Sequence, residues 1–173
     1  IEESRYYGNT ELIGPCTKAA RYLEKVQYKD GTFDLLTTNF MSPPDTAFMM
    51  ETVCVVLNVI GKNHDPLLRT PGLLELEEIL KEITLKAGEC LVTGGIHTPN
   101  HRWVVCRALA RIHLLFPDDR YIRRIDQWLA EGIDIDPDGQ YTEKSTGIYS
   151  IVVDDSFITL ARLLGRPELY EPV

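Results

Sequence analysis

Several features that would assign this chain to a common class are missing from its sequence. Of its 173 residues, no apolar run approaches the roughly 18 that a membrane-spanning helix needs, and the run at 53–60 ends at Gly61. Basic residues are outnumbered, with 18 Lys and Arg against 26 Asp and Glu, so the formal charge is −8. A chain this acidic is a poor match for nucleic acid or anionic membranes. We expect neither as a partner.

The sequence also lacks the cysteine patterns of zinc sites and disulfide-rich domains. Its cysteines are far apart and form no CxxC pair; they are Cys16, Cys54, Cys90 and Cys106. Those at 16, 54 and 106 lie in apolar helical stretches, which predicts buried free thiols. Free thiols favour a reducing compartment such as the cytoplasm. No signal-peptide pattern follows Ile1, and a start without Met leads us to expect a piece of a longer polypeptide.

Strand-like alternation is scarce, and apolar residues instead recur at helical spacing. Segments with this spacing are separated by polar loops marked by Gly or Pro; they are 15–26, 46–60, 73–87, 99–115, 118–131 and 147–164. The apolar share of 44% suffices for one core, so we predict a single all-α domain, 1–173, built of antiparallel helical hairpins. Residues 32–45 are expected to form a loop. The segment 46–60 is apolar almost all round and is expected to be deeply buried.

The string at 98–103, Thr-Pro-Asn-His-Arg-Trp, is typical of the start of a helix. Thr98 suits the N-cap position, and Pro99 suits the first helical position. Asn100 and His101 then fall in the first turn, beside unpaired backbone N–H groups and the positive end of the helix dipole. Such a place binds anions, so an amide and an imidazole there suit a carboxylate ligand.

A second string, 138–149, forms a loop that leads into the last predicted helix. It opens with Asp-Gly, which predicts a turn. Its polar residues alternate and suit a wall that offers hydrogen bonds to a ligand; they are Tyr141, Glu143 and Ser145. Tyr149 follows at the helix start, and its hydroxyl can move a proton. Together the two strings supply the groups needed for β-elimination at a uronic acid.

Other polar residues near these strings have plainer interpretations. His97 and His101 are four residues apart, a spacing that can bind a metal on one helix face. The helix start between them separates the two rings, so we expect no metal site. Arg102 can help to neutralise or position a carboxylate. Arg107 and Arg111 share a helix face with the first motif, and we expect them to form a solvated basic face.

The two motifs together resemble the heparinase II/III-like and alginate-lyase group of polysaccharide lyases. The resemblance is carried by Asn100-His101 at a helix start and by the later Asp-Gly…Glu-x-Ser-x-Gly-x-Tyr loop. It implies a fold that is part of an incomplete (α/α) toroid, usually followed in the group by β-sandwich domains. Thr146 and Ser150 depart from the group, which usually has Pro and His there. A second catalytic His or Tyr, typically from later in the chain, has no counterpart.

The resemblance also implies roles for single residues. Asn100 and His101 would hold the uronate carboxylate, and Tyr149 would be the catalytic tyrosine. Glu143 and Ser145 match the acidic and serine positions of the group's motif. The partner would be an acidic oligosaccharide or polysaccharide, and no step calls for a metal or an organic cofactor. Six helices make about half a toroid, so we expect a homodimer or further domains to cover the exposed apolar faces.

Two alternatives stay open. A glycoside hydrolase on a helical scaffold would use paired carboxylates, for which Asp45 with Asp134, Asp136 or Glu143 are the candidates. Asn39 and Asp45 are also candidate sugar contacts. The other alternative is a non-catalytic helical module for carbohydrate binding or assembly, which the short length favours.

Overall fold

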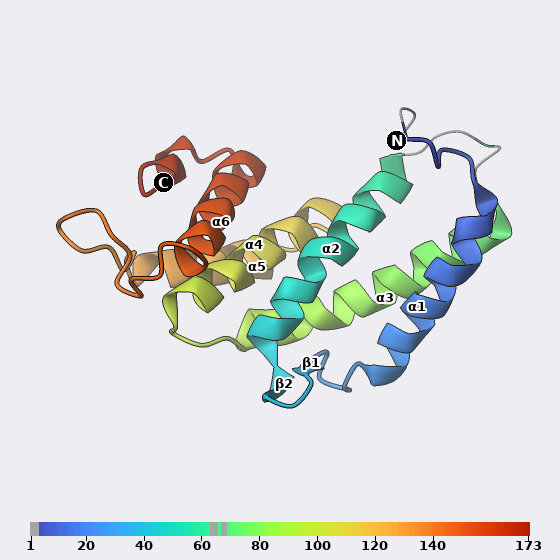
Figure 1. Cartoon of the computed structure of the whole chain (residues 1–173), viewed down its shortest axis with the longest axis horizontal. Coiled ribbons are helices and arrows are strands. Elements are labelled where there is room, and N and C mark those ends of the chain that lie inside the picture. The colour runs from blue at the N-terminus through green and yellow to red at the C-terminus, as the bar shows by residue number, and fades with distance from the viewer. Residues whose placement is uncertain (1–3, 63–65, 67–68) are drawn as a thin grey trace.

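The computed structural model describes residues 4–62, 66 and 69–173, and within these ranges the chain is mainly helical (Figure 1). The helices are α1 (Ile13–Val26), α2 (Pro43–Lys62), α3 (Pro71–Thr93), α4 (Pro99–Leu115), α5 (Asp119–Ala130) and α6 (Tyr149–Leu164). The same residues form two strands, β1 (Phe33–Leu35) and β2 (Asn39–Ser42), and two short 3-10 helices, η1 (Thr10–Leu12) and η2 (Pro167–Tyr170). The all-α prediction is confirmed.

The helices pack in two layers. In one layer α2, α4 and α6 lie side by side with α4 in the middle, and in the other α1, α3 and α5 are arranged in the same way around α3. The layers are joined where α2 packs on α3 and α4 packs on α5. Successive helices from α2 to α5 reverse direction (Figure 1). Because every second helix points the same way, α2 and α4 begin at the same end of their layer.

The central helix α4 is buried along most of its length. Ten of its 17 residues are buried, since it has neighbours in its own layer on both sides and α5 behind it. Trp103 of α4 packs on Phe157 of α6 with ring centroids 4.7 Å apart, and both side chains are fully buried. Burial of such large aromatic side chains is a main source of core stability. These contacts fix the position of the first turn of α4 relative to α6.

Most predicted helix boundaries agree with the structure to within a few residues, and the range 99–115 is confirmed. α2 begins at Pro43 rather than at 46, because two prolines can occupy a first turn where no N–H bond is needed. α3 continues to Thr93 instead of ending at 87. Its interior Gly88 is explained by packing, since a Cβ there would lie 2.5 Å from the hydroxyl oxygen of Tyr121 on α5.

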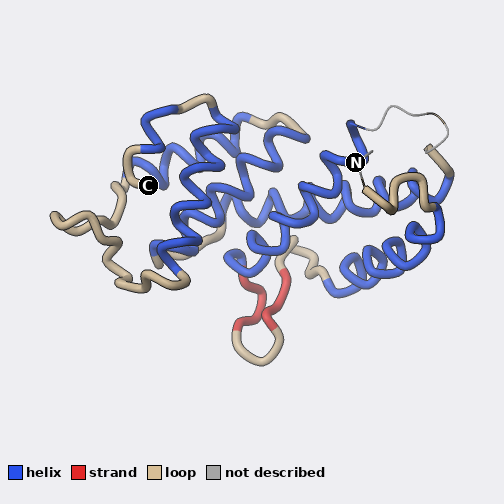
Figure 2. Tube along the Cα trace, turned by 45° about the horizontal axis from the view of Figure 1, so that its top comes forward, coloured by secondary structure: helices blue, strands red, loops and turns tan. Residues whose placement is uncertain are grey.

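The prediction of a simple loop for 32–45 is wrong, because β1 and β2 form an antiparallel hairpin there. The hairpin projects from the helices at the start of α2 (Figure 2). Side chains hold it in place: Thr46 of α2 accepts a hydrogen bond from the backbone N–H of Phe33, and Asp34 accepts one from that of Met41. These bonds join residues 13 and 7 positions apart. The strands therefore do not depend on an alternation of apolar and polar residues, which is the pattern that would have predicted them.

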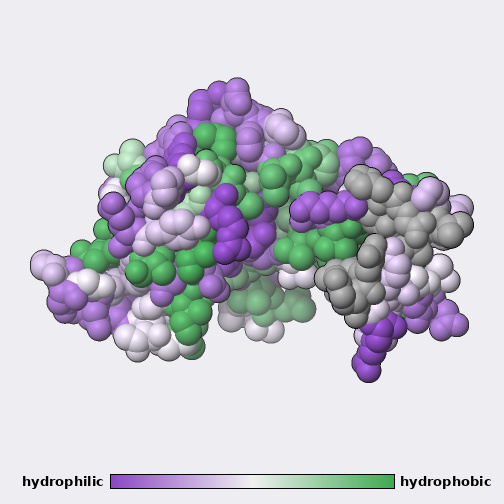
Figure 3. Space-filling model, turned by 90° about the horizontal axis from the view of Figure 1, so that it is seen from above, coloured by the Kyte–Doolittle hydropathy of each residue, from purple (hydrophilic) through white to green (hydrophobic). Residues whose placement is uncertain are grey.

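α2 is less buried than its composition predicts. Four of its apolar side chains form an exposed stripe: Phe48, Val55, Val56 and Val59. The reason is its place at the edge of the layer, where it has only α4 beside it. Among the described residues, α2 alone is long and apolar enough to cross a membrane by length and composition, a test that the core helix of a soluble protein also passes. Figure 3 shows hydrophobic side chains gathered in the middle of one face of the molecule.

Candidate functional site

The start of α4 is capped by a side chain from a distant loop. Thr98 occupies the N-cap position as predicted, but its hydroxyl makes no capping hydrogen bond. Instead, the Glu143 carboxylate accepts the backbone N–H of Asn100 at 2.8 Å and its side-chain Nδ2 at 2.6 Å. A carboxylate at this place is stabilised both by the unpaired N–H groups and by the helix dipole. The anion at this turn is thus an internal carboxylate, and the Asn100 donors that were predicted to hold a uronate carboxylate are used by Glu143.

The bond between Asn100 and Glu143 anchors the second motif to the first. Glu143 belongs to the loop 132–148, and Ser145 of the same loop begins the turn that leads into α6. The Ser145 carbonyl accepts the N–H of Ser150 at 3.0 Å, and its hydroxyl accepts that of Tyr149 at 3.5 Å. The loop and the first turn of α6 are thus fixed against the first turn of α4. Asn100 has a positioning role in this arrangement.

His101 faces the opposite neighbour, α2. Its ring lies edge-on to Phe48 with centroids 6.2 Å apart, whereas Asn100 faces the loop before α6. The Nδ1 atom of His101 is buried and has no hydrogen-bond partner among the described residues. An unpaired buried nitrogen of this kind costs on the order of 1–3 kcal/mol. No local pattern indicated Phe48 as a site residue, because only tertiary packing brings the start of α2 to His101.

Tyr149 is the first residue of α6 and is 44% exposed. It is therefore not a core tyrosine, and in the described residues its hydroxyl makes no hydrogen bond. Its neighbours Ile148 and Ile151 are more exposed still. An accessible phenol beside apolar side chains is suited to contact a bound molecule.

The substrate-binding role predicted for Arg102 does not fit the structure. Its side chain is only 4% exposed and pairs with Asp134 at 2.6 Å and Glu131 at 3.2 Å. A third bond runs from Nη2 to the carbonyl oxygen of Gly132, and the guanidinium lies 4.4 Å from the centre of the Trp103 ring. These contacts hold the end of α5 and the following loop against α4. Arg102 thus has a structural role, because both of its terminal nitrogens are bonded within the protein, while its Nε is buried without a partner among the described residues.

The substrate-binding role predicted for Tyr141 is likewise replaced by a structural one. The ring is buried, and its hydroxyl donates towards the Asp154 carboxylate at 2.8 Å and the Pro172 carbonyl at 3.0 Å. Burial and the bond to Asp154 raise the pKa of the Tyr141 phenol well above its usual range. Tyr141 is therefore a neutral hydrogen-bond donor that ties the loop to α6 and to the C-terminal segment.

Replacing Tyr141 with Phe should destabilise the protein by about 1–2 kcal/mol, because the half-buried Asp154 carboxylate loses its donor. The folded-state pKa of this phenol is raised, so its stabilisation is present below pH ~10 and is lost as the pH rises further. Thermal unfolding of both proteins between neutral pH and pH ~11 tests this expectation. The wild type should lose its advantage over the variant at the alkaline end, and a constant difference would contradict the role.

The carboxylates considered for a glycosidase pair all have partners. Asp45 accepts hydrogen bonds from Asn39 at 3.0 Å and from Ser42, so both of these candidate sugar contacts are bound to each other near the start of α2. Asp134 pairs with Arg102, as described above. Asp136 lies 3.6 Å from Lys144, and Glu143 caps α4. Each of these four carboxylates is therefore bound by a side chain of the protein itself.

His97 and His101 do not share a ligand site. The Nδ1 of His97 lies 2.9 Å from Glu131, and its ring packs on Trp128, away from Phe48 and His101. In the described ranges, no group of three or more His, Cys, Asp or Glu side chains is placed to hold a metal ion. The cysteines at 54, 90 and 106 are buried free thiols, but Cys16 is exposed, contrary to the prediction. Its place on α1, at the edge of its layer, explains the difference.

The prediction of a solvated basic face for Arg107 and Arg111 is also wrong. Their side chains are only 12% and 26% exposed, and both Nε atoms approach one carboxylate oxygen of Glu51 on α2, at 3.0 and 2.9 Å. Glu51 was not singled out in the sequence, since it lies in an apolar segment without any local pattern. These three side chains join α2 to α4 on the exposed side of the layer.

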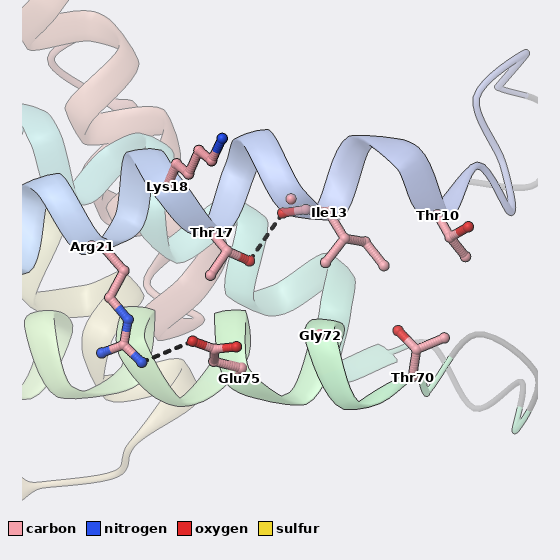
Figure 4. A pocket seen from close by; sticks show the side chains of 9 residues that line it. Thr10, Ile13, Thr17, Lys18, Arg21, Thr70, Gly72 and Glu75 are labelled. Carbon is pink, nitrogen blue, oxygen red and sulfur yellow. Dashed lines mark hydrogen bonds and ion pairs between the residues drawn. The ribbon is translucent and has the colours of Figure 1, made fainter.

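A groove of about 640 Å³ lies elsewhere, between the starts of α1 and α3 (Figure 4). Threonine hydroxyls, Gly72 and the ion pair of Arg21 with Glu75 line it, while Lys18 points away from α3. No residue of the two motifs reaches this groove. The charge of Arg21 is offset by Glu75 and Glu24, so the groove offers no strong charge to a ligand.

No model of a known protein family, no curated protein and no solved structure matches this chain.

Proposed function

We propose that this chain is the helical part of a polysaccharide lyase that cleaves uronic-acid polymers by β-elimination. The observation that carries the proposal is the bond between Asn100 and Glu143. It holds the loop that precedes Tyr149 against the helix start that bears His101. An imidazole with an unpaired nitrogen and an accessible phenol thus lie on either side of the first turn of α4.

The shape of the helical layers supports the same proposal. Parallel helices α2 and α4 in one layer, with reversed helices behind them, are the arrangement expected in part of an (α/α) toroid. We propose that a second copy of the chain or a further domain covers the exposed stripe on α2, which contains Phe48, Val55, Val56 and Val59.

The chemistry follows from the acidity of the substrate. The C5 proton of a uronic acid is barely acidic, because the neighbouring carboxylate is already negative. His101 would bind that carboxylate and stabilise the charge that develops on it when C5 loses its proton. Tyr149 would take the C5 proton, and the freed electron pair would form a C4=C5 double bond. The C4–O bond then breaks, and the departing oxygen would take the proton that the Tyr149 hydroxyl gives up, if both groups lie on one face of the sugar.

The test is the appearance of an unsaturated product. The purified chain is mixed with polymers of mannuronate, guluronate, glucuronate or iduronate, and ultraviolet absorbance is followed. Elimination creates a conjugated double bond and a rise in absorbance, whereas hydrolysis releases sugar ends without one. A binding module releases neither. Release of saturated sugars, or binding without any product, contradicts the lyase proposal.

A further inference from the structure

The cluster of Glu51, Arg107 and Arg111 has more positive charge than it needs for its own pairing. Two guanidinium groups share a single carboxylate oxygen, so the cluster keeps one net positive charge. No carboxylate other than Glu51 pairs with either arginine in the described part of the chain. Such an excess of charge at a largely buried place is costly unless an anion compensates it.

The donors of these arginines are also incompletely used. The Nε of Arg111 donates a hydrogen bond to Glu51, whereas the Nε of Arg107 lies 3.0 Å from Glu51 without forming one. The terminal nitrogens of both guanidinium groups make no hydrogen bond to any described residue. A guanidinium offers five N–H donors in a planar fork, which matches carboxylate or sulfate groups in a bidentate way. Glu51 therefore fixes the two forks in place while their outer edges remain available.

The cluster lies in line with the candidate site. Arg107 and Arg111 follow Asn100 by seven and eleven residues along α4, and their partner Glu51 follows Phe48, which packs on His101, by three residues along α2. The rise per residue sets the arginines about 10 and 16 Å along the helix from Asn100. An elongated ligand that begins at the first turn of α4 and runs along the exposed side of the layer reaches them.

We propose that Arg107 and Arg111 form a second anion-binding subsite, which takes the carboxylate or sulfate group of a sugar further along an acidic saccharide chain. This inference rests on the proposed function, from which it takes the class of ligand, an acidic saccharide. It does not depend on the elimination reaction, because the subsite only binds the saccharide. It predicts that affinity rises with chain length for acidic saccharides. The gain comes from the added acidic group, so neutral saccharides of equal length show none.

Binding of defined oligosaccharides by calorimetry tests this subsite. The probes are the disaccharides and hexasaccharides of mannuronate, guluronate, glucuronate and iduronate, with a neutral glucose hexasaccharide for comparison. In the wild type, at least one acidic hexasaccharide should bind about tenfold or more tightly than its disaccharide. In the double variant Arg107→Gln, Arg111→Gln this gain should vanish, while the disaccharide affinity changes by less than about twofold.

Two further variants separate binding from a purely structural role. Glu51→Gln keeps the size of the side chain and removes its charge, so both forks carry their full positive charge and the hexasaccharide should bind more tightly. Arg120→Gln removes one positive charge at another surface, where Arg120 pairs with Glu89 and Asp118, and should leave binding unchanged. If Glu51 and the two arginines only stabilised the fold, Glu51→Gln would not strengthen binding of the hexasaccharide.

The outcomes are distinct from those of the lyase test. The subsite is overturned if no acidic hexasaccharide exceeds the neutral one, or if Glu51→Gln fails to strengthen binding. If the double variant does not fold, the Glu51→Gln comparison decides alone. Length-dependent binding without an unsaturated product supports the subsite and refutes the lyase. Formation of an unsaturated product without any rise of affinity with saccharide length supports the lyase and refutes the subsite.

Discussion

Replacing Tyr149 with Phe should lower turnover on the uronic-acid polymer by about a hundredfold or more, since a positioned general acid or base contributes about that much. The change removes one hydroxyl from a side chain that is 44% exposed, and that hydroxyl makes no hydrogen bond to any described residue. Folding stability should therefore stay the same. The effect should fall on kcat rather than KM, because the hydroxyl acts only when the proton moves.

Tyr22 provides the matched control for this variant. It is an exposed tyrosine on α1, in the other layer, so Tyr22→Phe makes the same chemical change far from the start of α4. Its turnover should equal that of the wild type. Replacing His101 with Ala should lower kcat and also raise KM, because the imidazole would contact the carboxylate before and during the reaction. Full activity in Tyr149→Phe would place proton transfer elsewhere and contradict the proposed role.

Replacing Gly31 with Ala should destabilise the fold by about 3 kcal/mol or more and lower the melting temperature by roughly 10 °C. Gly31 has a φ of +91°, which L-residues rarely adopt, and a Cβ there would lie 2.0 Å from the carbonyl oxygen of Lys86 on α3. That oxygen belongs to helix backbone and cannot move aside cheaply. The turn after α1 would have to separate from α3, and the Gln27 side chain would lose its bonds to Gly31 and Ile83.

Gly139 separates the two causes of this loss. Its φ of +85° is almost the same, but a Cβ there meets nothing within 4 Å. Gly139→Ala should therefore show only the cost of the backbone conformation, about 1 kcal/mol. Chemical denaturation of both variants gives the difference that is due to the clash. Equal losses in the two variants would show that α3 yields to the added methyl group.

Local patterns were sufficient to predict where helices form. Helix 99–115 follows from Pro99 at its start and from apolar residues at helical spacing, and α6 ends where Gly165 adopts a left-handed conformation. Such signals act within a few residues, because helix caps and breakers bond or clash with their own turn. The anion-binding character of the first turn of α4 has the same local origin.

Packing decided which helix became the centre. α2 is apolar almost all round, yet it lies at the edge of its layer and leaves a stripe exposed, whereas α4 contains Arg102, Arg107 and Arg111 and is the most enclosed. The charges of α4 are tolerated there because acidic side chains from other elements pair with them. A residue's neighbours across the fold, not its own hydropathy, set the cost of burying it.

The sequence by itself determined the all-α class, the approximate positions of the helices and the residue types at the candidate site, because these depend on the backbone and on short-range spacing. Only the tertiary structure decided which side chains are free to act. It joined Glu143 to Asn100, 43 positions away, and bonded the side chains of Arg102 and Tyr141 to other parts of the protein. Among the described residues it left the Nδ1 of His101 and the hydroxyl of Tyr149 without partners. Hydrogen bonds between distant segments form only after the helices pack, so no local pattern records them.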